Sequence, residues 1–537
     1  MNGAPSQAYN DSMALEKTQN AYINLAFVGI SRRAESVDRE TLVQTFVDVG
    51  PLFAVLSTKD HQVVFGRRGT GKTHALLYVA EQNKLNNNVS IYIDLRYIGS
   101  SGGLYGDPSL PLSQRATRLL LDVLGTLHEE LLATAVDGNL DLSKVGPALD
   151  KLATAATDIE VVGETKLETK QTSGTSTNDA SDFKVSFSDT PSASASVGHT
   201  STQNVQHEGI VAQQGVARCR VHFGSVSTAL RDVVAAVVPS RILIVLDEWG
   251  TIPLDLQPYL ADLIRRAFFP VPGITVKIAA IEQRSLFRLG SGPDYLGIEI
   301  GADASADVDL DDYMVFDNNK ERAIEFFREL LFSHYQSETA ENKPDFASSH
   351  ALISAAFTQI NAFEDFVRSA EGVPRDAFNI LSVAAQRGMN DRISIPTIRI
   401  AARTWYQRDK ETAIKSNVNA YRLLTWIINE VIAHRKARAF LLTANSRHPL
   451  IDALFDSRLL HIVKKGLSGQ ELAGARYDAY KLDYGCYVDL LSTKSAPVGS
   501  FFDDEPEEKS ADIVVPTDDY RAIRRAVLNL DEFEAAS

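Results

Sequence analysis

Short apolar runs alternate with amphipathic stretches between residues 62 and 300, and this pattern predicts an α/β core. The runs at 63–65, 89–95, 242–246 and 274–281 are continuously apolar or nearly so, which is typical of parallel strands covered on both faces. Helical spacing between the runs is clearest at residues 111–135. We therefore expect a parallel sheet between two layers of helices, a three-layer sandwich.

Outside the core the pattern changes several times. It divides the chain into a disordered N-terminus at 1–20, a core at 21–310, a helical region at 311–410, a mixed unit at 416–495 and an acidic tail at 501–537. In the mixed unit the pattern predicts a helix at 418–432, a strand at 437–442, a helix at 449–455, and a strand pair at 459–463 and 477–491.

Residues 163–216 interrupt the core with a polar insertion rich in Ser, Thr, Gly, Asn and Gln. Such a composition favours a flexible segment, because it offers few large apolar side chains to bury. The alternation of apolar and polar residues at 183–188 leaves a second interpretation open, a protruding hairpin used for contacts.

The strand at 63–65 leads directly into GRRGTGKT at residues 66–73, a complete phosphate-binding loop or Walker A motif. Glycines let the backbone turn its N–H groups toward phosphate oxygens, and the following helix adds the positive end of its dipole. Lys72 would contact the β- and γ-phosphates, and the Thr73 hydroxyl would bind Mg²⁺. We expect the nucleotide to be bound by Gly66, Arg67, Arg68, Gly69, Thr70, Gly71, Lys72, Thr73 and His74.

A second motif, ILIVLDE at residues 242–248, has the form of a Walker B strand that ends at a polar site. Asp247 would hold Mg²⁺, directly or through water, and Glu248 would polarise the attacking water. Together the two motifs predict a nucleotide-binding protein, and the additional glutamate favours ATP hydrolysis over GTP. The predicted cofactors are ATP and Mg²⁺, and the predicted activity is that of an ATPase.

Composition narrows the class of protein. The 537 residues suit two or three domains, and no apolar run approaches the ~18 residues of a membrane span, so no membrane partner is expected. Two cysteines exclude a disulfide scaffold and a multi-cysteine zinc site, and they suit a reducing cytoplasm. The net charge of −15 argues against a protein that coats nucleic acid.

The mixed unit at 416–495 nevertheless has local positive charge. Its basic residues include Arg435, Lys436, Arg438, Arg447, Lys464, Lys465, Arg476 and Lys481. Aspartates are interspersed with them, so double-stranded DNA binding and a solvated mixed surface both remain open.

With EGVPRDAFNI at residues 371–380, these motifs make the chain similar to AAA+ ATPases, and within them to the origin-recognition and cell-division-control initiator group. The resemblance implies a helical lid at 311–410, a C-terminal winged-helix-like domain at 416–495, and DNA-associated remodelling or loading. It also implies that Arg375 reaches the γ-phosphate from the lid and acts in catalysis with Lys72 and Glu248. Gln283 takes the position where the family usually has a small polar sensor residue.

The sequence leaves two questions open, the role of four arginines and the function of the whole protein. Arg265, Arg266, Arg284 and Arg288 could include a finger that completes a neighbour's site, or they could be surface ion-pair partners. The loop also resembles that of bacterial signalling ATPases with apoptosis-type architecture, in which nucleotide acts as a switch for assembly with a protein partner, without DNA. A nucleotide-stabilised structural protein is a third interpretation. In the first two, homo-oligomers or protein partners are expected.

Overall fold

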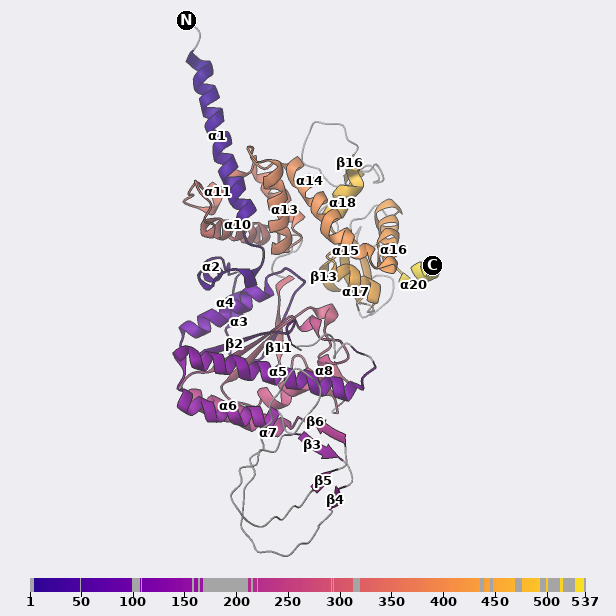
Figure 1. Cartoon of the computed structure of the whole chain (residues 1–537). Coiled ribbons are helices and arrows are strands. Elements are labelled where there is room, and N and C mark those ends of the chain that lie inside the picture. Colours follow the sequence, from indigo (N-terminus) through magenta and orange to yellow (C-terminus); the bar gives the residue numbers. More distant parts are fainter. Residues whose placement is uncertain are drawn as a thin grey trace, which may run out of the picture.

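The computed structural model describes most of the chain. The described residues are 4–48, 50–98, 107, 109–156, 159–162, 165–167, 211–213, 216–219, 221–290, 292, 294–311, 319–434, 439–444, 448–468, 476–492, 499–500, 512–514 and 527–535. Figure 1 shows an α/β core, a helical domain above it, and a mixed C-terminal unit beside the helical domain.

The core is built on a five-stranded sheet with the order β11-β1-β8-β7-β2, and its neighbouring strands are parallel. The strands are β1 (Gln62–Phe65), β2 (Val89–Asp94), β7 (Ile242–Asp247), β8 (Ile274–Ala280) and β11 (Ser305–Asp309). β8 lies between β1, which leads into the phosphate loop, and β7, which ends at Asp247. Because every residue of β7 and β8 is buried, the prediction of fully covered strands is confirmed.

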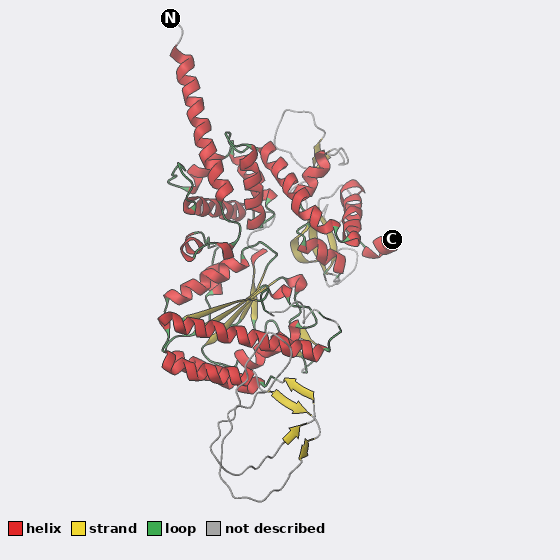
Figure 2. Ribbon diagram, in the orientation of Figure 1, coloured by secondary structure: helices red, strands yellow, loops and turns green. Residues whose placement is uncertain are grey.

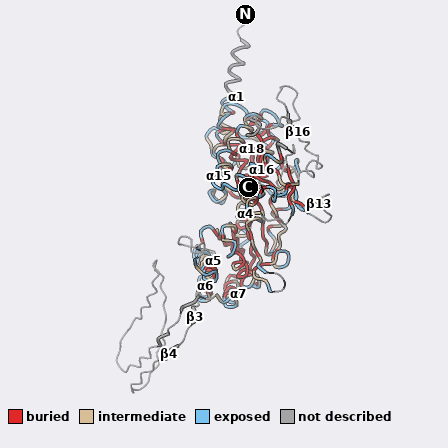
Figure 3. Tube along the Cα trace, turned by 90° about the vertical axis from the view of Figure 1, so that its right-hand side faces the viewer, coloured by how far each residue is buried: buried red, intermediate tan, exposed pale blue. Residues whose placement is uncertain are grey.

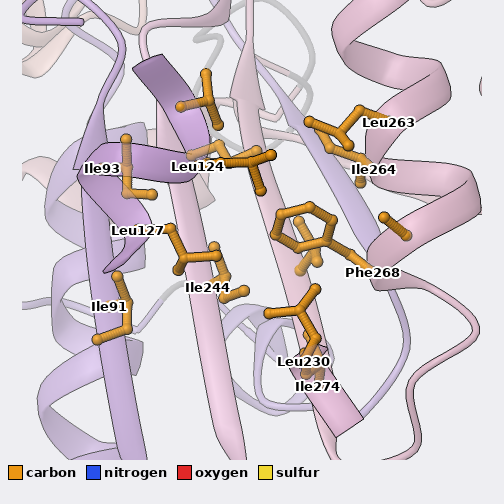
Figure 4. Close-up of a cluster of buried hydrophobic side chains, with 14 of the residues drawn as sticks. Ile91, Ile93, Leu124, Leu127, Leu230, Ile244, Leu263, Ile264, Phe268 and Ile274 are labelled. Atoms are coloured by element: carbon orange, nitrogen blue, oxygen red, sulfur yellow. The ribbon is translucent and has the colours of Figure 1, made fainter. Parts of the chain in front are cut away.

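Helices cover both faces of the sheet, so the predicted three-layer sandwich is confirmed. The helices of the core are α4 (Lys72–Leu85), α5 (Leu112–Thr134), η2 (Ala135–Asn139), α6 (Leu142–Ala156), α7 (Phe223–Val237), η3 (Trp249–Thr251), α8 (Gln257–Leu263), η4 (Ile264–Phe268) and η5 (Glu282–Arg284). On one face Ile91, Ile244 and Ile274 pack against leucines of α5 and α7 and against Phe268 (Figure 4). A short β9 (Arg288–Leu289) pairs with β10 (Leu296–Gly297) beside the sheet.

The opposite face of the sheet shares its buried cluster with the helical domain. Figure 3 shows buried positions in both parts of the chain. Val64 and Val245 from the sheet belong to the same cluster as Phe363 and Leu381 from the helical domain. The helices of that domain are α10 (Lys320–Ser337), α11 (Ser349–Ala356), α12 (Ile360–Ser369), α13 (Pro374–Arg387), α14 (Ile395–Trp405), η6 (Tyr406–Glu411) and α15 (Thr412–Lys415).

The prediction of disorder at residues 1–20 was wrong from residue 4 onward, because helix α1 spans Ala4–Gly29. Its C-terminal part is anchored on the helical domain: Ile23 and Phe27 are buried, and Asn24 Nδ2 donates to the carbonyls that follow α13. The polar composition of the first twenty residues gave no sign of this helix, because the residues that anchor it lie near its C-terminus. The lead-in to the core continues through η1 (Ala34–Ser36), α2 (Arg39–Gln44) and α3 (Leu52–Leu56).

The C-terminal unit contains a three-stranded antiparallel sheet with the order β12-β14-β13. Its elements are α16 (Val418–Ile427), η7 (Ile428–His434), β12 (Ala439–Thr443), α17 (Pro449–Asp456), β13 (Leu460–Ser468), β14 (Arg476–Leu482), α18 (Tyr484–Ser492), β15 (Gly499–Ser500), β16 (Asp512–Val514) and α20 (Leu530–Ala535). The strand predicted at 477–491 ends at Leu482, because Asp483 Oδ1 accepts from the Gly485 N–H and helix α18 begins there.

Antiparallel strand pairs lie at the two ends of the polar insertion and extend away from the core (Figure 2), so the prediction of a flexible segment was wrong for residues 165–167 and 211–213, where backbone pairing forms strands. They are β3 (Ile159–Val162) with β6 (Val216–Cys219), and β4 (Thr165–Leu167) with β5 (Val211–Gln213). The alternating residues at 183–188, which suggested a hairpin, lie outside the described residues.

Candidate nucleotide site

The phosphate loop follows β1, and α4 begins at Lys72. Gly69 and Gly71 have φ values of 85° and 96°, in the left-handed region that favours glycine. A Cβ on Gly69 would lie 2.8 Å from Cβ of Arg375, so this position also needs glycine for space. The loop borders a cavity of about 520 Å³, which is lined by residues Arg68 to Ala75 and is large enough for a nucleotide.

Lys72 lies against the carbonyls of its own loop. Its Nζ donates to the carbonyl oxygens of Gly66 at 2.7 Å and Arg67 at 2.9 Å. Burial lowers the pKa of Lys72, while Asp247 and Asp311 oppose that shift. The ammonium is therefore desolvated and held by neutral acceptors, and a phosphate oxygen would be a stronger partner for it.

Thr73 and Asp247, the two predicted metal ligands, are in direct contact. Thr73 Oγ1 donates to Asp247 Oδ2 at 2.6 Å, and the Tyr92 hydroxyl donates to the same oxygen at 2.9 Å. One hydroxyl and one carboxylate in contact are a donor set that suits Mg²⁺, which takes its other ligands from phosphates and water. No cluster of three or more His, Cys, Asp or Glu side chains that could hold a metal ion occurs in the described part of the chain.

Tyr92 was not predicted as a site residue. It lies on β2, and its Cα pairs with Val245 of β7, so its hydroxyl can reach the carboxylate at the end of that strand. Burial and the neighbouring Asp247 raise the pKa of Tyr92, which therefore stays a hydroxyl donor. A tyrosine in the apolar run at 89–95 was the only signal that the sequence offered.

Glu248 follows Asp247 in the left-handed conformation, with φ of 58°. Thr251 stabilises this turn, because its N–H and hydroxyl both donate to the Glu248 carbonyl, at 2.9 and 2.8 Å. Positive φ is uncommon outside glycine, and Glu248 lines the cavity just after the end of the strand.

Arg375 lies at the start of α13 and lines the same cavity. Its N–H donates to the Gly69 carbonyl at 3.2 Å, so the phosphate loop and the helical domain are in contact at this point. Its guanidinium forms no ion pair within the described residues, and its Nε is buried without a hydrogen bond. Burial and then the nearby Arg458 lower the pKa of Arg375.

Three further arginines, Arg32, Arg33 and Arg96, line the cavity and were missed by the motif analysis. Arg32 Nη2 donates to the Ser382 hydroxyl at 2.8 Å, and Arg33 is close enough to Arg375 to lower the pKa of Arg375. Arg32 and Arg33 form the polar turn after α1, where no motif marks them. The cavity thus gathers cations from the loop, from α13 and from the N-terminal lead-in.

Part of the cavity lining is aromatic, with His74, His334 and Phe378 among its residues. His74, at the start of α4, bonds through Nε2 to the Leu42 carbonyl at 2.9 Å, and the His334 ring lies 4.6 Å from that of Phe378. Burial lowers the pKa of His74, and it lowers the pKa of His334 to about 4. Neutral rings beside apolar side chains are a suitable surface for a nucleotide base.

Other predicted site residues lie elsewhere. Gly66, Arg67 and Gln283 line a second cavity of about 430 Å³ between the core and the C-terminal unit. Both the N–H and Nε of Arg67 donate to Asp311, at 3.0 and 2.7 Å, so its side chain is not directed at the nucleotide cavity. Arg68 lines the nucleotide cavity and pairs with Asp456 at 3.5 Å.

The four candidate finger arginines all have acidic partners. Arg265 and Arg266 pair with Asp262, Arg284 with Asp456, and Arg288 with Glu299. These contacts favour the ion-pair interpretation over a finger in this arrangement of the chain.

Comparison with known proteins gives a family match over part of the chain. Residues 31–100 match the ORC-CDC6-like family model. The match begins at the arginine turn, includes the phosphate loop, and confirms the predicted resemblance to the origin-recognition and cell-division-control group. None of the curated proteins matches the chain.

Two solved structures also align with the chain. The Aeropyrum pernix ORC1 protein in complex with DNA is 12% identical, with 87% of this chain and 96% of that chain covered and a TM-score of 0.29. Drosophila ORC bound to DNA is 10% identical, with 86% and 93% covered and a TM-score of 0.28. Among the described residues, no helix has the length and apolar character needed to cross a membrane.

Proposed function

We propose that the chain binds ATP with Mg²⁺ and hydrolyses it at the γ-phosphate. The observation that carries the proposal is the contact between Thr73 and Asp247 at 2.6 Å, beside a cavity that is lined by Lys72, Thr73 and Glu248. This is the arrangement that a phosphate loop and an acidic strand end need in order to share one metal ion.

Each residue then has a defined task. Lys72 would leave the Gly66 and Arg67 carbonyls for phosphate oxygens, where its charge offsets that of the nucleotide. Thr73 and Asp247 would hold Mg²⁺, which when bound neutralises phosphate charge and orients the γ-phosphate. Glu248 would orient the attacking water, and Arg375 would contact the γ-phosphate across the boundary between the core and the helical domain.

We further propose that the nucleotide state is coupled to DNA-associated remodelling or loading, through a winged-helix-like unit at 416–495. Support comes from the family match at 31–100 and from the basic residues of that unit. A second candidate is a nucleotide-switched signalling protein that assembles with a protein partner. One observation favours it: the C-terminal unit is docked on the phosphate loop through Arg68 and Asp456, so its position can report on the loop.

Size-exclusion chromatography with ATP or ADP, with and without duplex DNA, together with ATPase assays, tests the proposal. DNA-stimulated turnover and co-elution with DNA support the first function. ATP-dependent assembly that is indifferent to DNA supports the second. If the wild-type protein neither binds nor hydrolyses ATP, both are wrong.

A further inference from the structure

Arg67 of the phosphate loop is the centre of a buried polar network that no motif predicts. Its side chain is 2% exposed, and it contacts three parts of the chain at once. Nε donates to Asp311 Oδ1 at 2.7 Å, Nη2 donates to the Glu371 carbonyl at 3.0 Å, and Nη1 donates to His461 Nδ1. Asp311 follows β11, Glu371 precedes α13, and His461 lies on β13 of the C-terminal unit.

The other ring nitrogen of His461 is hydrogen-bonded to Asp483. Its Nε2 lies 3.1 Å from Asp483 Oδ2, and Lys410 Nζ donates to the same carboxylate oxygen at 2.5 Å. Lys410 also pairs with Asp376 at 2.8 Å, and all of these side chains are buried. Since Arg67 donates to Nδ1, the neutral ring keeps its proton on Nε2 and donates it to Asp483. The imidazole therefore has one orientation and one acceptor, and that acceptor faces the phosphate loop.

The backbone of Arg67 is part of the nucleotide site even though its side chain is not. The Arg67 carbonyl accepts from Lys72 Nζ at 2.9 Å and from the Thr70 hydroxyl at 2.9 Å. Fixing the Arg67 side chain consequently fixes the carbonyl that holds Lys72 and the start of the loop whose amides would meet phosphate. A loop that is ordered before the ligand arrives loses less conformational entropy on binding.

We propose that His461 is a positioning residue of the nucleotide site, which acts from the C-terminal unit by holding Arg67 and so ordering the phosphate loop for ATP. This inference rests on the proposed ATP binding. It adds that the site is complete only when the C-terminal unit is docked. Because the loop contacts phosphates in the ground state and the transition state alike, loss of the contact raises KM and the ATP Kd and changes kcat little.

Two substitutions of His461 separate its two hydrogen bonds. His461→Asn keeps an acceptor at the place of Nδ1 and loses the donor to Asp483, which retains Lys410. His461→Gln places its amide near Nε2 and loses the acceptor for Arg67, which retains Asp311 and the Glu371 carbonyl. Neither change leaves a charged side chain without a partner, so both proteins are expected to fold, and their melting temperatures check this.

We expect ATP·Mg²⁺ to bind His461→Asn within about threefold of wild type, and to bind His461→Gln about tenfold to a hundredfold more weakly, as for loss of one hydrogen bond to a charged group. The matched control is the pair His448→Asn and His448→Gln. His448 lies in the same unit and caps α17, and it is not among the residues that line the nucleotide cavity. Both control proteins should bind ATP like wild type.

Equal ATP affinities for His461→Asn and His461→Gln overturn the inference, whether both match wild type or both are weakened. If His461 had a purely structural role, the two amide variants would bind ATP equally well. If His461→Gln fails to fold, Arg67→Lys supplies the same test from the other side. The lysine keeps the charge beside Asp311 and loses the donor to His461, so Arg67→Lys should itself weaken ATP binding about tenfold to a hundredfold, and wild-type affinity in this variant would overturn the inference. Absence of ATP binding by wild type would instead contradict the proposed function.

Discussion

Replacing Lys72 by alanine tests the phosphate-loop assignment most directly. In the structure the ammonium donates two hydrogen bonds, to the carbonyls of Gly66 and Arg67. If two phosphate oxygens replace these carbonyls when ATP binds, each charge-assisted hydrogen bond from Lys72 contributes about 1.5–3 kcal/mol. Losing both would cost about 3–6 kcal/mol, or about 10²–10⁴ in the ATP Kd. Little else should change, because Lys72 is desolvated and has no acid within ion-pair distance in the described part of the chain.

Calorimetry with ATP·Mg²⁺ measures the change in Kd, and thermal unfolding checks it independently. ATP at about a hundred times the wild-type Kd should stabilise the wild type by about 2.7 kcal/mol and Lys72→Ala by no more than about 0.4 kcal/mol. Lys84→Ala is the control: this lysine lies on the same helix and pairs with Glu81. An unchanged Kd in Lys72→Ala would show that the phosphates lie elsewhere.

Three further perturbations probe the rest of the site. Glu248→Gln should bind ATP normally but hydrolyse it about 10²–10³ times more slowly in single turnover; wild-type turnover would assign the water to another acid. Arg375→Ala should abolish the difference between ATP and ADP in limited proteolysis across residues 390–420, since a nucleotide can shift the helical domain only through contacts that differ between ATP and ADP; two distinct digestion patterns would contradict this. His334 has a pKa of about 4 when folded and 6.5 when unfolded, so the unfolded chain binds more protons between these values. The unfolding free energy should therefore fall by up to about 3 kcal/mol as pH drops from 6.5 to 4, and the slope should be shallower in His334→Phe; an unchanged slope would refute the assignment.

Features that depend on adjacent residues could be predicted from the sequence. The phosphate loop and the strand ending at Asp247 are each continuous, and their contact follows once both are placed at one edge of a parallel sheet. Secondary structure was less certain where residues suit two conformations. Residues 484–491 contain tyrosines, valine and leucines that fit a strand, but packing of Tyr484 against Asp365 of α12, with a hydrogen bond of 2.8 Å, accompanies a helix.

Contacts between distant segments could not be predicted in this way. Arg67 and His461 are 394 positions apart, and neither residue type nor spacing marks them as partners. Tyr92 and Arg33 lack a motif for the same reason, since their roles arise only when β2 and the turn after α1 reach the cavity. A single sequence shows the chemistry of the loop, and the three-dimensional arrangement shows what holds the loop in place.

The docked position of the C-terminal unit also bears on the DNA proposal. Lys465 of β13 lies between Glu282 and Asp309 of the core, at 2.5 Å from Glu282. Asp456, at the end of α17, forms ion pairs with Arg68 and Arg284 of the core. In this arrangement Lys465 is paired with core carboxylates and so is not available to a DNA phosphate, and Asp456 at the end of α17 faces the core.

DNA bound through this unit would therefore compete with the core for Lys465 and favour undocking, which would also withdraw His461 from Arg67. If docking orders the phosphate loop, ATP and DNA must then oppose each other. Because linkage is reciprocal, DNA would weaken ATP binding by the same factor by which ATP weakens DNA binding. A DNA site that leaves the docked contacts intact would show no such coupling, so the sign of the linkage distinguishes a surface that includes Lys465 from one elsewhere on the chain.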